Sequence, residues 1–188
     1  MNFVQPIRDP TVVEAIKEHF KITNERNYIF FCLGIYSGLR VSDLLNLKVG
    51  LVRGTHIEIR EQKTGKKKRF IIHPDIRPDL DSYISGMKDQ DFLFPSRQKK
   101  RSSGLPNRPL DRSSAYKMLN IAARKFGLTD IGCHTMRKTW GYHLYMADPR
   151  NLALLMKMFN HSTETTTLMY LGLTQDMMDA AITRLRYA

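Results

Sequence analysis

The sequence has little cysteine, no long apolar run and far fewer acidic than basic residues. Its 188 residues include only two cysteines, Cys32 and Cys133. Two cysteines without a secretory signal argue against a disulfide scaffold and suit a reducing cytoplasm. The first ten residues lack the basic stretch and apolar core of a signal peptide, and no apolar run approaches the length of a membrane span. We therefore expect no membrane segment.

A pattern typical of a metal site is also missing. Zinc would need more Cys or His side chains at close spacing. No acidic cluster suited to Mg²⁺ is visible in the sequence. We therefore expect neither a metal ion nor another cofactor.

What the chain has in excess is positive charge. Thirty Lys and Arg against 18 Asp and Glu give a formal net charge of +12. This imbalance favours a polyanionic partner, of which nucleic acid is the commonest. The alternative is a basic protein kept soluble by its charge. Hydrophobic residues at 42% and charged residues at 26% are typical of a globular chain.

Periodicity predicts a mainly helical α+β fold with one small antiparallel sheet. The alternation in residues 55–61 and 69–73 predicts two strands, and the turn at 63–66 joins them into a hairpin. Residues 98–109 are rich in Lys, Arg, Ser, Gly and Pro and predict an exposed basic loop. No interdomain linker is visible, so residues 1–188 are expected to form a single domain. Helices are expected at residues 10–20, 24–37, 41–47, 79–87, 112–126, 134–146, 151–159, 163–171 and 175–186.

Two of the polar motifs place an Arg where it can bind an anion. His134 and Arg137 are three residues apart, so one helical face presents both. Arg40 starts a helix after Gly38, and Asp43 is placed to orient it or to cap that helix. A guanidinium makes forked contacts with phosphate oxygens. Taken alone, His134 and Arg137 are better explained as a surface pair, and Arg40 with Asp43 could be an ordinary Arg–Asp surface pair.

Two further motifs carry a Lys, a His and a Tyr. Lys63 lies at the base of the basic hairpin turn, which can reach into a DNA groove. His161 precedes a polar helix start, and Tyr170 follows nine residues later. The alternatives are a charged turn that keeps the hairpin soluble and a tyrosine of the core.

Taken together and in this order, the motifs resemble those of the tyrosine recombinase (phage integrase) family. That family carries Gly-Leu-Arg-x-x-Glu/Asp, a hairpin Lys, His-x-x-Arg, and Gly-His-Ser followed by Thr-Thr and a Tyr. The resemblance covers almost the whole chain and implies the fold of the tyrosine recombinase catalytic domain. The matching residues are Gly38, Leu39, Arg40, Asp43, Lys63, His134, Arg137, His161, Ser162, Thr166 and Tyr170.

The sequence departs from the family pattern at two positions. Asn160 stands where the family usually has Gly, and Asn tolerates a positive φ better than most residues. Lys138 follows Arg137 where His is more frequent, and we expect neither departure to touch a catalytic position. For the hairpin Lys, Lys63 is preferred over the three lysines at 66–68 because the family's Lys stands before Thr-Gly.

The resemblance implies a site-specific recombinase or integrase that cuts and rejoins DNA through a 3′-phosphotyrosyl intermediate, without metal or ATP. It makes Tyr170 the nucleophile, His134 the base and Lys63 the acid for the leaving 5′-oxygen. Arg40, Arg137 and His161 would stabilise the transition state. Contacts to double-stranded DNA are expected from Lys66, Lys67, Lys68, Arg69, Arg97, Lys99, Lys100 and Arg101.

Two other functions fit parts of the pattern. A type IB topoisomerase uses the same chemistry to relax supercoils, but the spacing of His161 and Tyr170 and the short chain favour a recombinase. A degenerate integrase that binds DNA as a regulator would not need the intact polar set. The family resemblance implies a bacterial or phage-encoded protein that acts in the cytoplasm.

The ends of the sequence carry expectations about assembly. The catalytic-domain motifs begin close to the first residue, so we expect no separate N-terminal core-binding domain of the kind that many relatives carry. Residues 173–188 form a C-terminal tail, in which Met178, Ala181, Ile182 and Leu185 recur on one helical face. This stripe either folds back on its own domain or docks on a neighbour. The resemblance favours docking in trans, in a homotetramer on paired DNA sites, by a protein that is monomeric off DNA.

Overall fold

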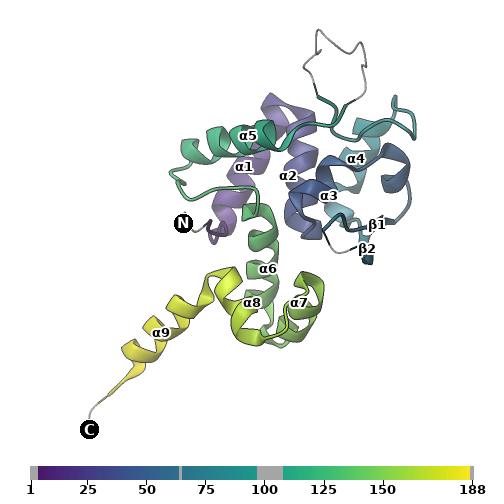
Figure 1. The fold of residues 1–188 in the computed structure, drawn as a ribbon. Coiled ribbons are helices and arrows are strands. Elements are labelled where there is room, and N and C mark those ends of the chain that lie inside the picture. Colours follow the sequence, from purple (N-terminus) through teal and green to yellow (C-terminus); the bar gives the residue numbers. More distant parts are fainter. Residues whose placement is uncertain (1–3, 64, 97–107, 187–188) are drawn as a thin grey trace.

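The computed structural model describes residues 4–63, 65–96 and 108–186, and it confirms the predicted fold class (Figure 1). The expected basic residues Arg97, Lys99, Lys100 and Arg101 lie outside the described residues. The expected elements all occur, with ends within a few residues of the prediction. The helices are α1 (Pro10–Thr23), α2 (Glu25–Ser37), α3 (Val41–Leu45), α4 (Arg77–Ile84), α5 (Arg112–Lys125), α6 (Thr135–Ala147), α7 (Leu152–Phe159), α8 (Glu164–Leu171) and α9 (Leu173–Arg184), and the strands are β1 (His56–Arg60) and β2 (Lys67–Ile71).

Local chemistry sets the ends of the first two helices. Asp9 accepts a hydrogen bond from the Thr11 amide at 2.8 Å, and Asn24 accepts one from the Asn27 amide, so each caps the helix that follows. Gly38 ends α2 with a φ of 62°. A Cβ on Gly38 would lie 2.4 Å from the Trp140 ring, so glycine is needed for the conformation and for the close approach of α6.

Helix α2 lies at the centre of the main hydrophobic core. Its nearly continuous apolar run is buried, and Ile29, Phe30 and Cys32 have no exposed surface. Helices α1, α4 and α6 pack around it. The buried side chains of β1, β2 and α5 join the same cluster, which fixes the hairpin and the start of α3 on one rigid body. None of the helices within the described ranges combines the length and apolar content that a membrane crossing needs.

The hairpin is antiparallel, with Ile57 opposite Phe70 on its buried face. Its turn is closed at Glu61, whose amide donates to Lys66 O at 3.0 Å and whose carbonyl accepts from Gly65 N at 2.8 Å. The second strand begins at Lys67, two residues earlier than expected, because these turn bonds bring Lys67 opposite Arg60. The hairpin therefore holds the backbone on either side of Lys63.

A second, smaller core joins the C-terminal helices to α6. Leu155, Phe159, Leu171 and Leu173 are buried there, and Trp140 and Tyr142 pack against them. Met136, one turn before Trp140 on the same helix, belongs to the main core instead. Helix α6 thus spans both cores and connects the larger body to α7 and α8 (Figure 1).

Beyond the first turn of α9, the described part of the tail does not fold back on the domain. Helix α9 extends away from the other helices (Figure 1), and Met178, Ile182 and Leu185 are 52%, 69% and 55% exposed. Of the two arrangements that the sequence leaves open, packing in cis is therefore not the one found in this structure.

Candidate active site

The predicted catalytic residues meet in one place. Separate elements supply them: the start of α3, the hairpin turn, the first turn of α6, and the α7–α8 turn with α8 itself. They lie at the junction between the two cores, where α6 passes from one to the other. A cavity of about 240 Å³ is lined by Arg40, Lys63, His134, Arg137, Phe159, Asn160, His161 and Tyr170.

Arg137 is fixed from behind by backbone carbonyls. Its guanidinium is buried, donating to Gly38 O and, at 3.1 Å, to Met158 O. It also lies 4.7 Å above the Phe159 ring. Burial lowers the pKa of Arg137, but a guanidinium still keeps its charge at neutral pH. The site therefore holds a permanent positive charge in a set orientation.

Arg40 is oriented by Glu61 and not by Asp43. Its Nη1 lies 2.5 Å from Glu61 Oε1, and the Glu61 side chain is only 1% exposed. Asp43 is buried, and its Oδ1 accepts from the Gln62 amide at 3.1 Å. The expectation that Asp43 orients Arg40 or caps α3 is therefore wrong, since this carboxylate holds the end of β1. Burial raises the pKa of Asp43.

His161 is placed by a turn that needs a positive φ. Asn160 ends α7 with φ 60° and ψ 46°, which confirms the expectation that Asn replaces the usual Gly in that conformation. The His161 ring then lies with Nδ1 3.1 Å from the Thr167 hydroxyl. Burial, followed by the charges of Arg137 and Arg40, lowers the pKa of His161. Because Nδ1 faces Thr167, Nε2 is the ring nitrogen that can bind a group in the cavity.

Tyr170 lies on the last turn of α8, packed against Phe159 and His161 at centroid distances of 4.9 and 5.3 Å. Its hydroxyl is 3.4 Å from His134 Nδ1. Burial raises the pKa of Tyr170, and the charges of Arg137 and Arg40 oppose that rise. Partial desolvation and then the charge of Arg112 lower the pKa of His134. A neutral imidazole therefore faces a phenol that holds its proton.

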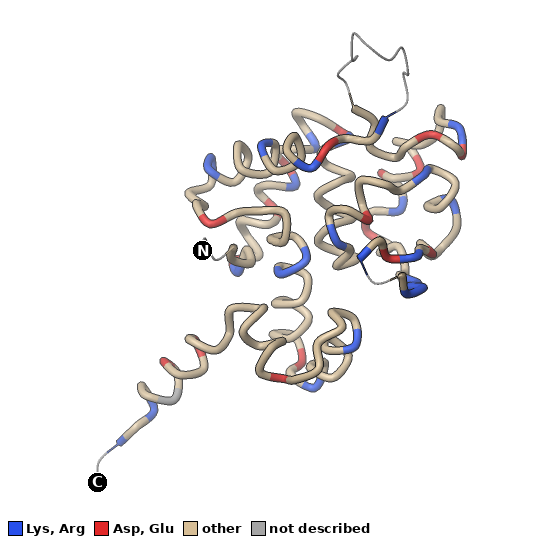
Figure 2. Tube along the Cα trace, in the orientation of Figure 1, with Lys and Arg blue, Asp and Glu red and all other residues tan. Residues whose placement is uncertain are grey.

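Basic residues gather on the hairpin (Figure 2), and their side chains have different surroundings. Lys63 is exposed and lines the cavity. Lys66 Nζ donates to Asn160 Oδ1 at 3.1 Å, and Lys68 Nζ donates to the carbonyls of Lys157 and Met158. These two ammonium groups therefore tie the hairpin to the C-terminal end of α7, a role that the sequence did not indicate. Arg69 pairs with Glu58 on the sheet surface, and Lys67 is exposed.

Lys138 corrects another expectation. Its ammonium lies 5.0 Å from the centroid of the Tyr170 ring and donates to Val4 O at 2.8 Å. Burial lowers the pKa of Lys138 to about 8. The position after Arg137 thus does touch a predicted catalytic residue. In the described part of the chain, no three His, Cys, Asp or Glu side chains are grouped as a metal site needs.

Sequence reasoning missed two residues of this site, Glu61 and Thr167. Glu61 stands at the end of the predicted strand, where its burial is not visible from the pattern. Thr167 is fully buried under His161, inside a run of three threonines whose members the sequence does not distinguish. A helical projection could have singled out Thr167. It places residue 167 one turn before Tyr170, on the side of α8 away from solvent.

A known protein family matches most of the chain. The profile of the phage integrase family fits residues 9–177. The chain belongs to the phage integrase family. Its relatives are tyrosine recombinases, which decides against the topoisomerase and regulator alternatives. The "Probable integrase/recombinase YoeC" of Bacillus subtilis is 36% identical over 182 residues, which make up 96% of each chain.

Other tyrosine recombinases are longer than this chain. A tyrosine recombinase of Pseudothermotoga lettingae is 26% identical, over 95% of this chain and 65% of its own length. The crystal structure of XerA recombinase superposes with a TM-score of 0.73 at 23% identity, over 97% of this chain and 67% of that one. A post-cleavage complex of XerH with a palindromic difH substrate gives a TM-score of 0.68 at 17% identity, over 92% of this chain and half of that one.

Proposed function

We propose that this integrase-family chain cleaves and rejoins double-stranded DNA through Tyr170. The phenol oxygen attacks a backbone phosphorus, the 5′-oxygen leaves, and a 3′-phosphotyrosyl link forms. One phosphodiester replaces another, so the reverse reaction rejoins the strand without ATP. The observation that carries the proposal is that all six residues implied by the family resemblance line one cavity, although they come from four parts of the chain.

Each side chain has a role that its surroundings support. His134 accepts the phenol proton, because its hydrogen-bonding distance and lowered pKa suit a base. Lys63 protonates the leaving 5′-oxygen. Arg40, Arg137 and His161 donate hydrogen bonds to the non-bridging oxygens, where negative charge gathers in the transition state. The first two are held by Glu61 and by backbone carbonyls, so little reorganisation is needed as that charge develops.

Double-stranded DNA is the partner that the charge favours. The net charge of +12 attracts a polyanion, and the related fold of XerH has been solved with its DNA substrate. We place this activity in the cytoplasm, where the free thiols of Cys32 and Cys133 stay reduced. DNA affinity should fall steeply with added salt, because each neutralised phosphate releases counterions.

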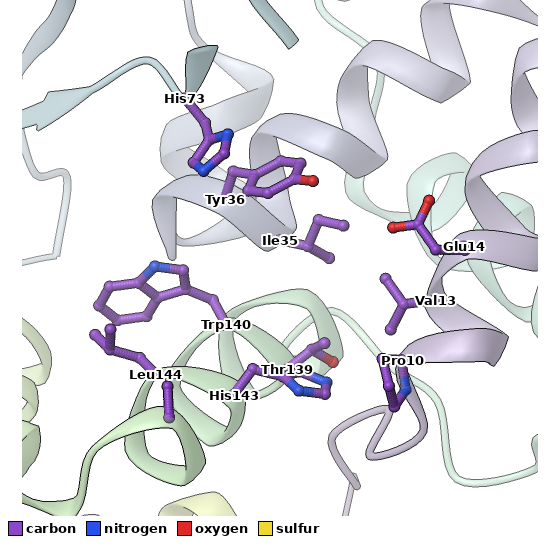
Figure 3. Close-up of a pocket in the computed structure, with 11 residues that line it drawn as sticks. Pro10, Val13, Glu14, Ile35, Tyr36, His73, Thr139, Trp140, His143 and Leu144 are labelled. Carbon is purple, nitrogen blue, oxygen red and sulfur yellow. The ribbon is translucent and has the colours of Figure 1, made fainter. Parts of the chain in front are cut away.

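The assembly proposed is a tetramer on paired DNA sites, joined by the tail. No other described part of the chain covers the exposed apolar face of α9, which is the state expected of a segment that docks on a second copy. An apolar cavity of about 340 Å³ offers an acceptor (Figure 3). Val13 of α1, Ile35 of α2, and Trp140 and Leu144 of α6 line it.

The tail is tested by Ile182→Asp, a change at a residue that is 69% exposed. The variant should keep its melting temperature and lose the higher-order complex on DNA, measured by sedimentation. Removal of residues 175–188 should have the same effect. A variant that still assembles would rule out docking through this face. Unfolding of the shortened chain would show that the helix packs in cis.

Cleavage is tested with nicked duplexes drawn from the DNA that flanks the gene, on which a covalent adduct accumulates because the nicked end diffuses away. Wild-type protein should form the adduct, and Tyr170→Phe should form none while binding the same duplex equally well. Tyr145→Phe is the matched control and should react like wild type. An adduct formed by Tyr170→Phe would refute the assignment of the nucleophile.

A further inference from the structure

Residues 4–8, called here the N-terminal segment, lie along α6 and are joined to it by several hydrogen bonds. Gln5 O accepts from the Thr135 hydroxyl at 3.1 Å, the Ile7 amide donates to the Thr139 hydroxyl at 2.9 Å, and Ile7 O lies 2.9 Å from His143 Nε2. Ile7 is 2% exposed and belongs to the main core. The segment is therefore a fixed part of the fold, and its far end reaches the C-terminal helices.

At that far end, Arg8 binds the junction between α8 and α9. Its Nη1 lies 2.7 Å from both carboxylate oxygens of Asp176, in the first turn of α9. Its Nη2 donates to Gly172 O at 2.8 Å. Gly172 ends α8 with a φ of 76°, and a Cβ there would lie 3.0 Å from Gln5 Oε1. The positive φ of this turn therefore requires a glycine, and a Cβ there would crowd the Gln5 side chain.

Gly172, whose carbonyl Arg8 binds, is two residues from Tyr170 in the sequence. Because Arg8 donates to a carbonyl at the C-terminal end of α8, its charge also interacts favourably with the dipole of that helix. The N-terminal segment is also linked to Tyr170 through Lys138. Val4 O accepts from Lys138 Nζ, and this ammonium lies 5.0 Å from the Tyr170 ring centroid. The ring and the end of its helix are therefore both held by residues that precede α1.

Helix α8 otherwise packs against α6 and α7. The small core beneath it contains only four buried residues among those described, of which Leu171 is the one from α8. A shift of about 1 Å in a reacting group can slow a reaction about 100-fold. We propose that Arg8 is a positioning residue for Tyr170, which acts by fixing the α8–α9 junction and with it the direction in which α9 leaves the domain.

An ordinary surface ion pair is the competing explanation. The side chains of Arg8 and Asp176 are 39% and 38% exposed, and such pairs contribute about 0–1 kcal/mol to stability. The two explanations differ in what they predict. A surface pair affects neither the cleavage rate nor the environment of Tyr170, whereas a positioning contact affects both and leaves DNA affinity unchanged.

The test compares Arg8→Ala with Arg150→Ala, which removes an exposed Arg–Asp pair between α6 and α7. Single-turnover cleavage by Arg8→Ala should be about 10- to 100-fold slower at unchanged DNA affinity, and Arg8→Lys should recover part of the rate. Asp176→Asn should lie between wild type and Arg8→Ala, because the bond to Gly172 O remains. Arg150→Ala should cleave like wild type. A wild-type cleavage rate for Arg8→Ala would overturn the proposal.

A second readout does not depend on cleavage, since the proposal rests on the assigned role of Tyr170. With 3-fluorotyrosine incorporated, the ¹⁹F resonance assigned to Tyr170 should shift and broaden in Arg8→Ala but not in Arg150→Ala. If the wild-type protein forms no adduct and this shift still occurs, the proposed function is wrong and the positioning contact stands. If cleavage is normal in wild type and the resonance does not change in Arg8→Ala, the positioning contact is wrong and the function stands.

Discussion

Arg40 and Glu61 form a nearly buried ion pair beside the candidate active site, with Nη1 and Oε1 2.5 Å apart. The Nδ2 of Asn160, the residue before His161, also donates to Glu61 Oε2 at 3.4 Å. One carboxylate thus links the hairpin, the start of α3 and the turn that carries His161. Its position explains how an arginine with a partly buried head group is held ready for a phosphate.

Replacing Glu61 with Gln should test this link. The amide keeps the shape but removes the charge that orients Arg40, so single-turnover cleavage should slow about 10- to 100-fold. Glu58→Gln, which removes an exposed partner of Arg69, should leave cleavage unchanged. Equal rates for the two variants would show that Arg40 needs no carboxylate to hold it.

Lys63 is expected to act as the general acid, a contribution of about 10²- to 10⁴-fold. Lys63→Ala should lose this factor on normal DNA. On a substrate whose bridging 5′-oxygen is replaced by sulfur, the variant should cleave as fast as wild type, because a thiolate of ordinary pKa about 8.5 leaves without a proton. Lys66→Ala serves as the control. Any loss that it shows should be the same on both substrates.

We expect the Thr167 hydroxyl to affect cleavage through the orientation of the His161 ring. Thr167→Val keeps the buried shape but removes the hydroxyl 3.1 Å from His161 Nδ1, so the ring loses its fixed orientation. We expect cleavage to slow about tenfold or more while DNA affinity is kept. Thr167→Ser restores the hydroxyl and should recover most of the rate. If Thr167→Ser cleaves no faster than Thr167→Val, the contact between Thr167 and His161 does not contribute to catalysis.

The pKa values of His134 and His161 are both lowered, so the folded protein binds these protons more weakly than the unfolded chain does. Their contribution to stability is therefore present above the ordinary His pKa of about 6.5 and is lost as the pH falls through the lowered folded values. Cleavage should fall over the same acidic range, because a protonated His134 cannot accept the Tyr170 proton.

Urea unfolding and single-turnover cleavage, each measured from about pH 7 down to pH 5, check this dependence. His161→Gln should flatten part of the stability profile and leave the part due to His134. Stability that rises as the pH falls across this range would contradict the direction of both shifts.

The sequence by itself determined the elements and the chemistry of this integrase. Asp9, Asn24 and Gly38 carry their capping signals locally, and the apolar run of α2 shows its own burial, so their elements follow from neighbouring residues. Arg40, His134, Arg137, His161 and Tyr170 are visible because their order and spacing form a motif. The need for a positive φ at residue 160 also shows in the choice of Asn.

Only the tertiary structure decided which side chains hold those residues in place. Glu61 meets Arg40 across 21 residues, and Arg8 meets Gly172 across 164, distances over which no periodicity in the sequence operates. Asp43 was the nearer carboxylate in sequence, yet burial turns it toward the Gln62 amide. Such partners depend on how α6 joins the two cores, because hydrogen bonds and ion pairs form only between groups that packing has brought within about 3 Å.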